Sequence, residues 1–538
     1  MSVIESRIDT HSDQFKQNRE EMLKCVEELR AVEAKVRATE ESKRERFAKR
    51  GQLLPRDRVN LMLDRGSPFL ELSTLCGYKY HDDKDGSLAG GNTITGIGYV
   101  SGTRCMVSAS NSAIKGGTMT PWGVQKTLRI QEIAELQKLP VVSMIESGGA
   151  NLMYQEDLFI PGGKTFANQA RLSAAGIPQV TVVHGSSTAG GAYMPGLSDY
   201  VIMVKKKAKV FLAGPPLLKA ATGEIATDEE LGGAEMHGTV AGTCEYLAED
   251  DADGVRIARD VVAQLHWNNH LPVYTPRDYK EPLYDIDELC GAVPPDYRKP
   301  YDCREVIARL VDGSEFMEFK ADFDQQTICG QATIEGWPVG IIGNNGPITT
   351  KGANKAGQFI QICNQSDMPI IFLQNITGYM VGTDAEQGGM VKHGSKMIQA
   401  VANSKVPHIT VVVGGSFGAG NYGMCGRGYD PDFIFAWPNS RTAVMGGEQA
   451  AKVISIVTEA KMKAAGKDVP EDFLKKMEQQ IIDKFDEQSH PFNGSARLWD
   501  DGLIDPRDTR RVLAMTLSVC REARMRKLHP NSFGVARL

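Results

Sequence analysis

The feature that most constrains the fold of this chain is an internal repeat. The segment Pro178–Tyr193 aligns without a gap with Pro407–Tyr422, at an offset of 229 positions, and 8 of the 16 aligned residues are identical. Self-similarity at a fixed offset indicates that one structural unit is used more than once. We therefore expect two copies of one fold in tandem, joined within the proline-rich stretch 272–299. Further matching pairs are Pro140 with Pro369, Gly149 with Gly378 and, more loosely, 93–96 with 333–336.

Each copy shows the same order of sequence patterns. A proline is followed by an apolar, β-branched run, then by a loop rich in Gly and Ser, and then by helical spacing. Strands that are apolar on both faces and alternate with helices are typical of a layered α/β core around a parallel sheet. The sequence thus predicts an α/β protein with two domains, at 46–285 and 286–538. A helical segment at 1–45 precedes them, because apolar residues recur at helical spacing over 11–37.

The composition argues against several classes of protein. A chain of 538 residues, 41% hydrophobic and 24% charged, has the balance of an ordinary soluble globular protein. The net charge of −6 and the lack of any long one-signed block argue against nucleic acid as a partner. The ten cysteines include no C-x-x-C pair, the chain starts without a leader pattern, and no apolar run is long enough to span a membrane. We expect a cytoplasmic protein that binds no membrane.

The glycine loop of the second copy fits three interpretations. Gly418–Gly423 matches the dinucleotide fingerprint G-x-G-x-x-G, and Gly414–Gly418 matches the nucleophile elbow G-x-S-x-G of hydrolases. The third interpretation is an oxyanion hole, made by backbone N–H groups where a glycine loop enters a helix. The first copy, Gly185–Gly191, matches neither motif but keeps the order strand, glycine loop, helix. The repeat therefore favours the oxyanion hole.

Both copies keep a pair of small residues in this loop, Gly190–Gly191 and Ala419–Gly420, whose N–H groups can converge on one oxygen. Two such loops indicate two developing negative charges to stabilise. A hydrolase stays open as an alternative, since acidic residues and His490 follow Ser416, although a hydroxyl in loop or cap hydrogen bonding is the favoured role for this serine. No helix-borne His pair, Cys cluster or acidic triad occurs, so we expect no metal in this chain. Lys115, Gly116 and Gly117 form either a phosphate site or an ordinary turn.

These loops resemble the carboxyltransferase (β) subunits of biotin-dependent acyl-CoA carboxylases, in the 3-methylcrotonyl-CoA and geranyl-CoA branch. Asn151 favours this branch, because propionyl- and acetyl-CoA carboxylases usually have Arg at that point of the motif. The motifs that carry the resemblance span most of the chain: Arg50–Arg58, Lys115–Gly117, Glu146–Asn151, Ala189–Tyr193, Phe211–Pro216, Ala220–Glu224, Gly414–Met424 and Met445–Glu448.

The resemblance implies two tandem crotonase-like (ClpP/crotonase) domains with separate tasks. The first domain would hold the acyl-CoA, with the N–H groups of Gly190 and Gly191 on the thioester oxygen. The second would hold carboxybiotin, with the N–H groups of Ala419 and Gly420 on the ureido oxygen of biotin. In this family carboxybiotin releases CO₂ and the biotin enolate takes the substrate proton, so no side chain is required as the base. The residues expected to bind substrate are Lys115, Gly116, Gly117, Gly148, Gly149, Ala150, Gly162, Gly163 and Phe417.

The same resemblance implies partners. The chain contains neither an Ala-Met-Lys-Met biotinylation site nor an ATP-binding domain, so biotin would arrive on the lysine of a separate biotin carboxylase/biotin carrier α subunit. The family places its site between the first domain of one subunit and the second domain of another. That arrangement implies a homo-oligomer, a β6 hexamer within α6β6.

The substrate is predicted from one position. In methylcrotonyl-CoA carboxylases the stretch after Ser-Gly-Gly-Ala-Asn typically carries a bulky aromatic residue before Gly-Arg, and here Gly162 stands in its place. Loss of a ring opens the space that the extra prenyl unit of geranyl-CoA needs, so we expect a geranyl-CoA carboxylase β subunit that carboxylates the γ-carbon. A glycine needed only for a turn is the opposing interpretation. The alternatives are a 3-methylcrotonyl-CoA carboxylase β subunit, a biotin-dependent acyl-CoA decarboxylase subunit, a stand-alone hydratase and a non-catalytic scaffold.

Overall fold

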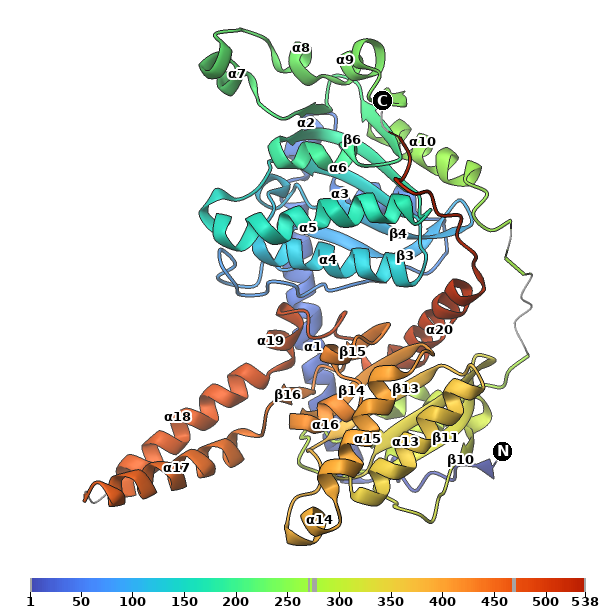
Figure 1. The fold of residues 1–538 in the computed structure, drawn as a ribbon, viewed down its shortest axis with the longest axis vertical. Helices are drawn as coiled ribbons and strands as arrows, with labels where there is room; N and C mark the ends of the chain where they lie inside the picture. The colour runs from blue at the N-terminus through green and yellow to red at the C-terminus, as the bar shows by residue number, and fades with distance from the viewer. Residues whose placement is uncertain (1, 270, 273–277, 467–470, 537–538) are drawn as a thin grey trace. The chain divides into compact units, whose positions relative to one another are not determined.

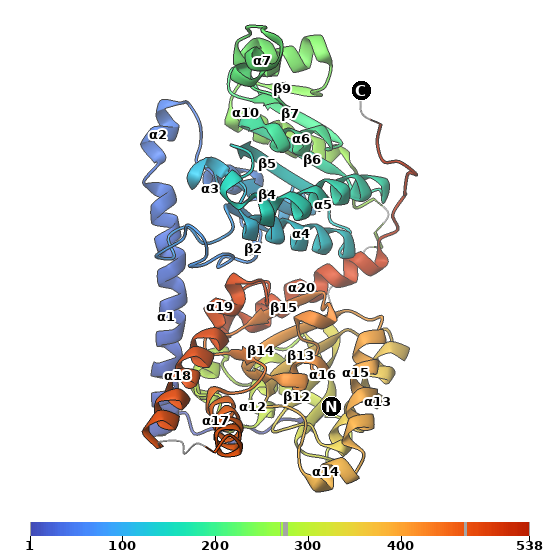
Figure 2. The same cartoon turned by 60° about the vertical axis from the view of Figure 1, so that its left-hand side comes forward.

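The computed structural model describes residues 2–269, 271–272, 278–466 and 471–536. Contacts divide the chain into two compact units (Figures 1 and 2). The N-terminal unit consists of Ala31–Val273 with Ala496–Leu498 and Val519–Leu538, and the C-terminal unit consists of Tyr274–Ser495 with Met1–Arg30 and Trp499–Ser518. Each unit therefore consists of several separate segments of the chain, whereas the expected domains 46–285 and 286–538 are continuous. The N-terminal unit includes a C-terminal segment of the chain, and the C-terminal unit includes an N-terminal segment. The predicted helix at 11–37 is α1 (Asp13–Glu41), whose residues belong to both units.

A mixed sheet forms the centre of the N-terminal unit. Its strands, in sheet order, are β2 (Leu70–Glu71), β3 (Thr93–Val100), β4 (Thr103–Ser110), β5 (Val141–Ser147), β6 (Gln179–Thr188), β7 (Tyr200–Val204) and β9 (Tyr246–Ala248), and β8 (Lys209–Phe211) pairs with the end of β6. The pairs among β2, β3 and β4 are antiparallel, and β4, β5, β6 and β7 run parallel. Because parallel strands end at the same edge, the loops that follow β4, β5 and β6 gather there.

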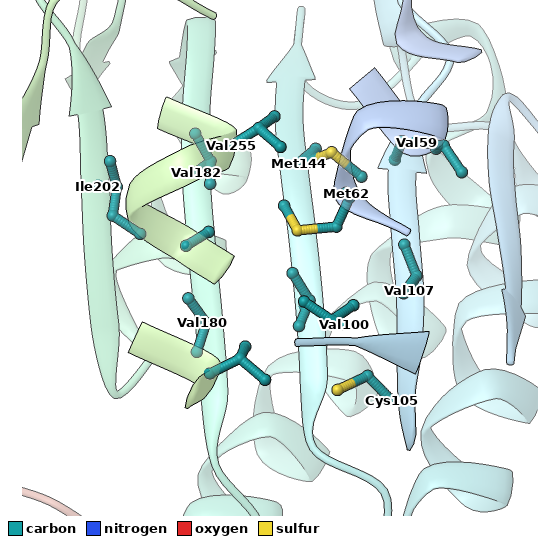
Figure 3. Packing of buried hydrophobic residues seen from close by; sticks show 14 of the residues in the cluster. Val59, Met62, Val100, Cys105, Val107, Met144, Val180, Val182, Ile202 and Val255 are labelled. Atoms are coloured by element: carbon teal, nitrogen blue, oxygen red, sulfur yellow. The ribbon is translucent and has the colours of Figure 1, made fainter. Parts of the chain in front are cut away.

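Helices cover both faces of this sheet. On one face α3 (Pro55–Met62) and α10 (Asp251–Gln264) pack on the strands, and Figure 3 shows their side chains meeting those of the strands in one layer. Val180, Val182 and Ile202 are fully buried there, and burial of each contributes about 1.5–3 kcal/mol. On the other face α4 (Pro121–Leu136) and α5 (Gln155–Ala174) lie side by side (Figure 1).

The C-terminal unit repeats this architecture. Its strands, in sheet order, are β1 (Ser2–Val3), β10 (Glu315–Glu318), β11 (Thr327–Ile334), β12 (Trp337–Asn344), β13 (Ile370–Ile376), β14 (His408–Phe417) and β15 (Phe433–Ala436), and β16 (Arg441–Ala443) pairs with β14. Helices α13 (Thr350–Gln365) and α15 (Met390–Asn403) pack against each other as α4 and α5 do. Helices α17 (Gly447–Ala464) and α18 (Glu471–Ser489) form a hairpin after β16 (Figure 1).

The structure confirms the tandem repeat in its backbone hydrogen bonds. The same bonds to proline carbonyls recur at 2.9 Å in both units: Met106 N–H to Pro140 O and Val141 N–H to Pro178 O, then Gly340 N–H to Pro369 O and Ile370 N–H to Pro407 O. The looser sequence match of 93–96 with 333–336 is wrong. Thr93 opens β3 opposite Ser110, whereas Thr333 lies near the end of β11 opposite Pro338.

The correct counterpart of β3 is β11, because Thr93 then corresponds to Thr327 at an offset of 234. After β4 and β12 the offset between the two copies is 229. The offset changes because the loop 111–118 after β4 is five residues longer than the loop 345–347 after β12. This longer loop contains Lys115–Gly117, so that motif has no counterpart in the C-terminal unit. Within the described part of the chain, no helix has the length and apolar character needed to cross a bilayer.

Candidate active site

Three loops meet at the carboxyl ends of β4, β5 and β6 in the N-terminal unit. They are the 3₁₀ turn η1 (Lys115–Gly117), the segment 148–150, and the 3₁₀ turn η3 (Ala189–Ala192). Gly148 N–H donates to Gly116 O at 3.3 Å, and Met119 N–H donates to Gly149 O at 2.9 Å. Ser147, just before the second loop, pairs with Ser187, just before the third. The structure thus brings together the sequence-predicted residues of all three loops.

Glycine is required by geometry at two places in these loops. Gly117 has φ +68°, and a Cβ there would lie 2.2 Å from Glu146 O. Gly149 has φ +86° and donates its N–H to Ser147 Oγ at 3.1 Å. A side chain at Gly117 would force the loop away from Glu146, and a side chain at Gly149 would be strained by the positive φ.

The loop around Gly190 and Gly191 has the form of an anion-binding turn. The Ser187 hydroxyl, itself fully buried, donates to Gly191 O at 2.9 Å and fixes the start of the turn. A Cβ on Gly190 would meet no atom within 4 Å, so the backbone there faces open space. Since the first N–H groups of a helical turn have no partner inside it, they are available to an oxygen that enters this space.

Lys115 is placed beside the loops, but its charge is already paired. Its ammonium lies 2.6 Å from Asp82 Oδ2, and the Tyr154 hydroxyl donates to the other oxygen of Asp82 at 2.8 Å. The hydrogen bonds from Lys115 and Tyr154 lower the pKa of Asp82. A role for Lys115 on a phosphate stays a prediction, and a phosphate there would compete with Asp82.

Gly162 and Gly163 lie inside α5, so the structure places no turn at Gly162. α5 begins at Gln155 and continues through Pro161 to Ala174. A Cβ on Gly162 or Gly163 would meet no atom within 4 Å. Gly162 is one turn before Phe166, whose ring centroid lies 5.6 Å from that of Tyr193, next to η3.

The C-terminal unit builds the corresponding loop from α16 (Gly418–Gly423), which follows β14. Ala419 is exposed and Gly420 is buried. A Cβ on Gly420 would lie 2.6 Å from Ile376 Cγ1 and 3.0 Å from Gly378 Cα, so only glycine fits. Ile348 N–H donates to Gly378 O at 3.1 Å, which repeats the bond from Met119 to Gly149.

The two generic motifs at this loop have a structural explanation. Ser416 is fully buried, donates to Gln374 Oε1 at 2.5 Å and accepts from Asn421 Nδ2 at 2.7 Å, so it lacks the exposed hydroxyl of a nucleophile elbow. The G-x-G-x-x-G match opens a helix of six residues. Phe417 is buried with its ring 5.0 Å from that of Tyr297, so its contact with a ligand stays a prediction.

Sequence reasoning missed a buried charged cluster beneath the N-terminal loops. Arg58 is 1% exposed and donates to Glu146 Oε2 at 3.0 Å and to Asp251 Oδ2 at 2.9 Å. His184, fully buried, donates from Nδ1 to Asp251 Oδ1 at 3.0 Å. The available signal was a histidine and a glutamate that directly follow apolar runs, because such side chains are rarely buried without partners.

Burial and charge set the protonation of this cluster. Burial lowers the pKa of His184 and the charge of Arg58 lowers it further, although Asp251 and Glu146 oppose both. Burial raises the pKa of Asp251, but the hydrogen bond from His184 and the charge of Arg58 outweigh burial and leave that pKa lowered. The histidine is therefore neutral and the aspartate ionised at neutral pH.

Two α/β units of one design, each closing its parallel strands with glycine loops that can hold an oxyanion, define a tandem-domain carboxyltransferase. The carboxyl transferase domain family matches residues 46–535, and the chain belongs to that family. It is the carboxyltransferase component of a biotin-dependent acyl-CoA carboxylase, as the sequence motifs predicted.

Known proteins are similar over the whole chain. The β subunit of geranyl-CoA carboxylase from P. aeruginosa is 60% identical, with 100% of both chains covered and a TM-score of 0.94, which confirms the two-domain crotonase-like α/β fold. The probable biotin-dependent acyl-coenzyme A carboxylase beta2 subunit of Mycobacterium tuberculosis is 48% identical over 100% of both proteins. The probable mitochondrial methylcrotonoyl-CoA carboxylase beta chain of Drosophila melanogaster is 46% identical over 96% of this chain and 92% of that protein.

Proposed function

We propose that this carboxyltransferase moves a carboxyl group from carboxybiotin to the γ-carbon of geranyl-CoA. The observation that carries the choice of substrate is the pair Gly162–Gly163 in the interior of α5. A glycine inside a helix costs about 0.5–1 kcal/mol relative to alanine. Neither glycine has a positive φ, and neither has an atom within 4 Å of a Cβ. Nothing in the described part of the chain therefore requires glycine there, which supports a space kept free for a ligand.

The position of this space supports an acyl pocket. Gly162, Phe166 and Gln169 follow one face of α5, and Gln169 Nε2 donates to Met194 O at 2.9 Å. This face is directed at the residues that follow Gly190 and Gly191, so an acyl chain whose thioester is held by that loop would extend along Gly162. The 60% identity with a geranyl-CoA carboxylase β subunit supports the same substrate.

Each loop has a role in this proposal. Biotin, carried on a separate α subunit, supplies the carboxyl group. Gly190 and Gly191 N–H groups bind the thioester oxygen, whose negative charge grows during carboxylation, and Ala419 and Gly420 N–H groups bind the ureido oxygen.

We further propose that the protein works as a homo-oligomer, a β6 core within α6β6, in the cytoplasm. Each unit has large apolar side chains that are more than half exposed. They include Met153, Phe159 and Ile160 in the N-terminal unit and Val453 and Ile456 in the C-terminal unit. Where such side chains form one patch, the patch marks a protein interface.

A second candidate substrate is 3-methylcrotonyl-CoA, because methylcrotonoyl-CoA carboxylase β chains of several organisms are 44–46% identical to this chain. The variant Gly162→Phe separates the two. With α subunit, ATP and bicarbonate, we expect kcat/KM for geranyl-CoA to fall by roughly 10–200-fold, the range for steric discrimination in an apolar pocket. Activity on 3-methylcrotonyl-CoA should persist or rise.

The matched control is Lys164→Phe, which adds the same ring at an exposed position of the same helix. It should leave both activities unchanged. Unaltered geranyl-CoA kinetics in Gly162→Phe, or a wild-type enzyme that prefers 3-methylcrotonyl-CoA, would overturn the choice of substrate.

A further inference from the structure

The parallel strands β5 and β6 contain a bulge directly below the glycine loops. Ile145 pairs with Val183 but Ser147 pairs with Ser187, so residues 184–186 of β6 lie opposite Glu146 alone. The carboxyl group of Glu146 occupies this bulge, because a Cβ on Gly185 would lie 2.8 Å from Glu146 Cδ.

One carboxylate connects all three loops of the N-terminal unit. Ser112 Oγ, at the base of the loop 111–118, donates to Glu146 Oε2 at 2.8 Å. The chain continues from Glu146 directly into Ser147–Gly149. The bulge that Glu146 occupies leads into η3, and Gln52 Nε2 spans the bulge by donating to His184 O at 2.9 Å and to Glu146 Oε1 at 3.4 Å.

Arg58 binds the carboxylate of Glu146, and burial of this charged cluster leaves polar atoms without hydrogen bonds among the described residues. Arg58 Nη2 and His184 Nε2 are buried and have no hydrogen-bond partner among the residues that the structure describes. Replacement of a buried ion pair by apolar residues is often neutral or stabilising. A charged cluster with unsatisfied atoms at this position therefore indicates a requirement for geometry.

In the C-terminal unit an uncharged residue occupies the position that corresponds to Glu146. Asn375 occupies the place of Glu146 in the same bulge between β13 and β14, and its Oδ1 accepts Gly415 N–H at 3.0 Å. The loop 345–347 after β12 is short and lacks a counterpart of Ser112. At this position a carboxyl group is present only in the copy where a longer third loop must also be placed.

We propose that Glu146, held by Arg58, is a positioning residue that sets the three glycine loops of the N-terminal unit relative to one another. Through Ser112 it places η1, through its own chain the segment 147–149, and through the bulge the turn at Gly190 and Gly191. The effect on carboxylation rests on the proposed function, and the effect on the loops does not.

Glu146→Gln tests this role. Arg58 Nη1 and Ser112 Oγ donate to Glu146 Oε2, and Gln52 Nε2 donates to Oε1. Whichever way the amide of the variant is turned, its NH₂ therefore faces an N–H donor of Arg58 or of Gln52. We expect kcat for acyl-CoA carboxylation to fall about 10–100-fold with KM for acyl-CoA changed less than about threefold, since misplacement of N–H groups acts mainly in the transition state. Amide hydrogen exchange should accelerate in 112–117, 147–149 and 185–191.

The matched control is Glu305→Gln in the C-terminal unit. Glu305 pairs at 2.8 Å with Arg309, which is 1% exposed and has a second carboxylate partner in Glu288, as Arg58 has in Asp251. This variant should keep kcat and the exchange rates of the three segments. Unchanged kcat and exchange in Glu146→Gln, or equal losses in Glu305→Gln, would overturn the proposal.

Two further outcomes are decisive. If the wild-type enzyme carboxylates no acyl-CoA, the proposed function fails, while the exchange pattern still decides whether Glu146 positions the loops. If Glu146→Gln does not fold, Ser112→Ala removes one hydroxyl from the same carboxylate. It should then accelerate exchange in 112–117 and lower kcat a few-fold, and an unchanged protein would refute the role.

Discussion

The two glycine-loop regions of the molecule share a backbone and differ in what supports it. In both units the two central parallel strands, β5 with β6 and β13 with β14, contain a bulge at the same place. In both units a backbone hydrogen bond also joins two loops: the loops after β4 and β5 in one unit, and the loops after β12 and β13 in the other. Below the bulge lies a charged cluster in the N-terminal unit and an amide in the C-terminal unit. The two copies thus share the bulge and this backbone bond, whereas the side chains at the bulge differ.

The divergence changes how each region responds to protons. The loop of the C-terminal unit is held by Gln374, Ser416 and Asn421, none of which titrates near neutral pH. The loop of the N-terminal unit stands above His184 and Asp251, whose pKa values are both lowered. As the pH falls, protonation of His184 and Asp251 should therefore disturb the loop of the N-terminal unit at a pH where the loop of the C-terminal unit is still unaffected.

The largest expected effect separates the two loops by function. Gly191→Leu adds a bulky side chain to the turn of the N-terminal unit, where a Cβ alone would already contact Ser187 Oγ at 3.4 Å. We expect acyl-CoA carboxylation to fall by at least about 10³-fold, since loss of one oxyanion donor alone costs about 10²–10³-fold. Decarboxylation of carboxybiotin on the α subunit without acyl-CoA should survive, because the proposed function assigns that step to Ala419 and Gly420.

The reciprocal variant is Gly420→Leu, which should remove both activities. Gly428→Leu serves as the control, because a Cβ on Gly428 would meet no atom within 4 Å. Equal loss of both activities in a folded Gly191→Leu protein would break the division of labour between the loops.

The repeat and the apolar strands made the fold predictable. Prolines at strand starts, β-branched runs and glycine loops are local signals, and they placed β5, β6, β13 and β14 correctly. The interior of α5 was not predicted, because Pro161–Gly163 has the local signature of a turn. Packing overrides it: Thr165 is buried and its carbonyl accepts a bond from Gln131 of α4 at 2.9 Å.

The support of the site could not be derived from sequence for a different reason. Arg58 lies 88 residues from Glu146 and 193 from Asp251, so no local pattern joins them. The repeat held a partial signal, because the offset of 229 pairs Glu146 with Asn375 and His184 with Val413. Positions where one copy has a charge and the other does not are therefore the places to search for a difference in function.

A second prediction concerns acid and compares a buried histidine in each unit. Burial lowers the pKa of His408 to about 4, and burial also lowers that of His184. In the unfolded chain each histidine takes up a proton near pH 6.5, whereas in the folded chain burial delays protonation to lower pH. The free energy of unfolding is therefore highest above pH 6.5 and decreases as the pH falls below it. For His408 the loss between pH 6.5 and 4 is about 3 kcal/mol.

Calorimetry across this pH range checks the sign. His408→Gln should weaken the fall in stability, and so should His184→Gln. Only His184→Gln should also alter the acid limb of kcat, since His184 lies in the bulge below the loops while His408 starts β14 at the opposite end of the strand. If the acid limb of kcat changes equally in His184→Gln and His408→Gln, His184 has no special effect on the loops of the N-terminal unit, and the expected difference between the two units is wrong.

The smallest expected effect tests where the two regions should behave alike. Thr120 and Thr349, at the offset of 229, cap α4 and α13, and their Oγ1 atoms accept N–H bonds from Gly123 at 3.2 Å and Gly352 at 3.0 Å. Loss of such a cap costs about 1 kcal/mol, which for units of this size lowers Tm by about 2–4 °C. Thr120→Ala and Thr349→Ala should therefore shift thermal unfolding equally, and Thr→Ser at either position should restore most of the loss. Because the capped helices lie next to the glycine loops but donate nothing to them, kcat should stay within about twofold in both variants. A large difference between the two shifts would show that the repeat has diverged in its helices as well as below its loops.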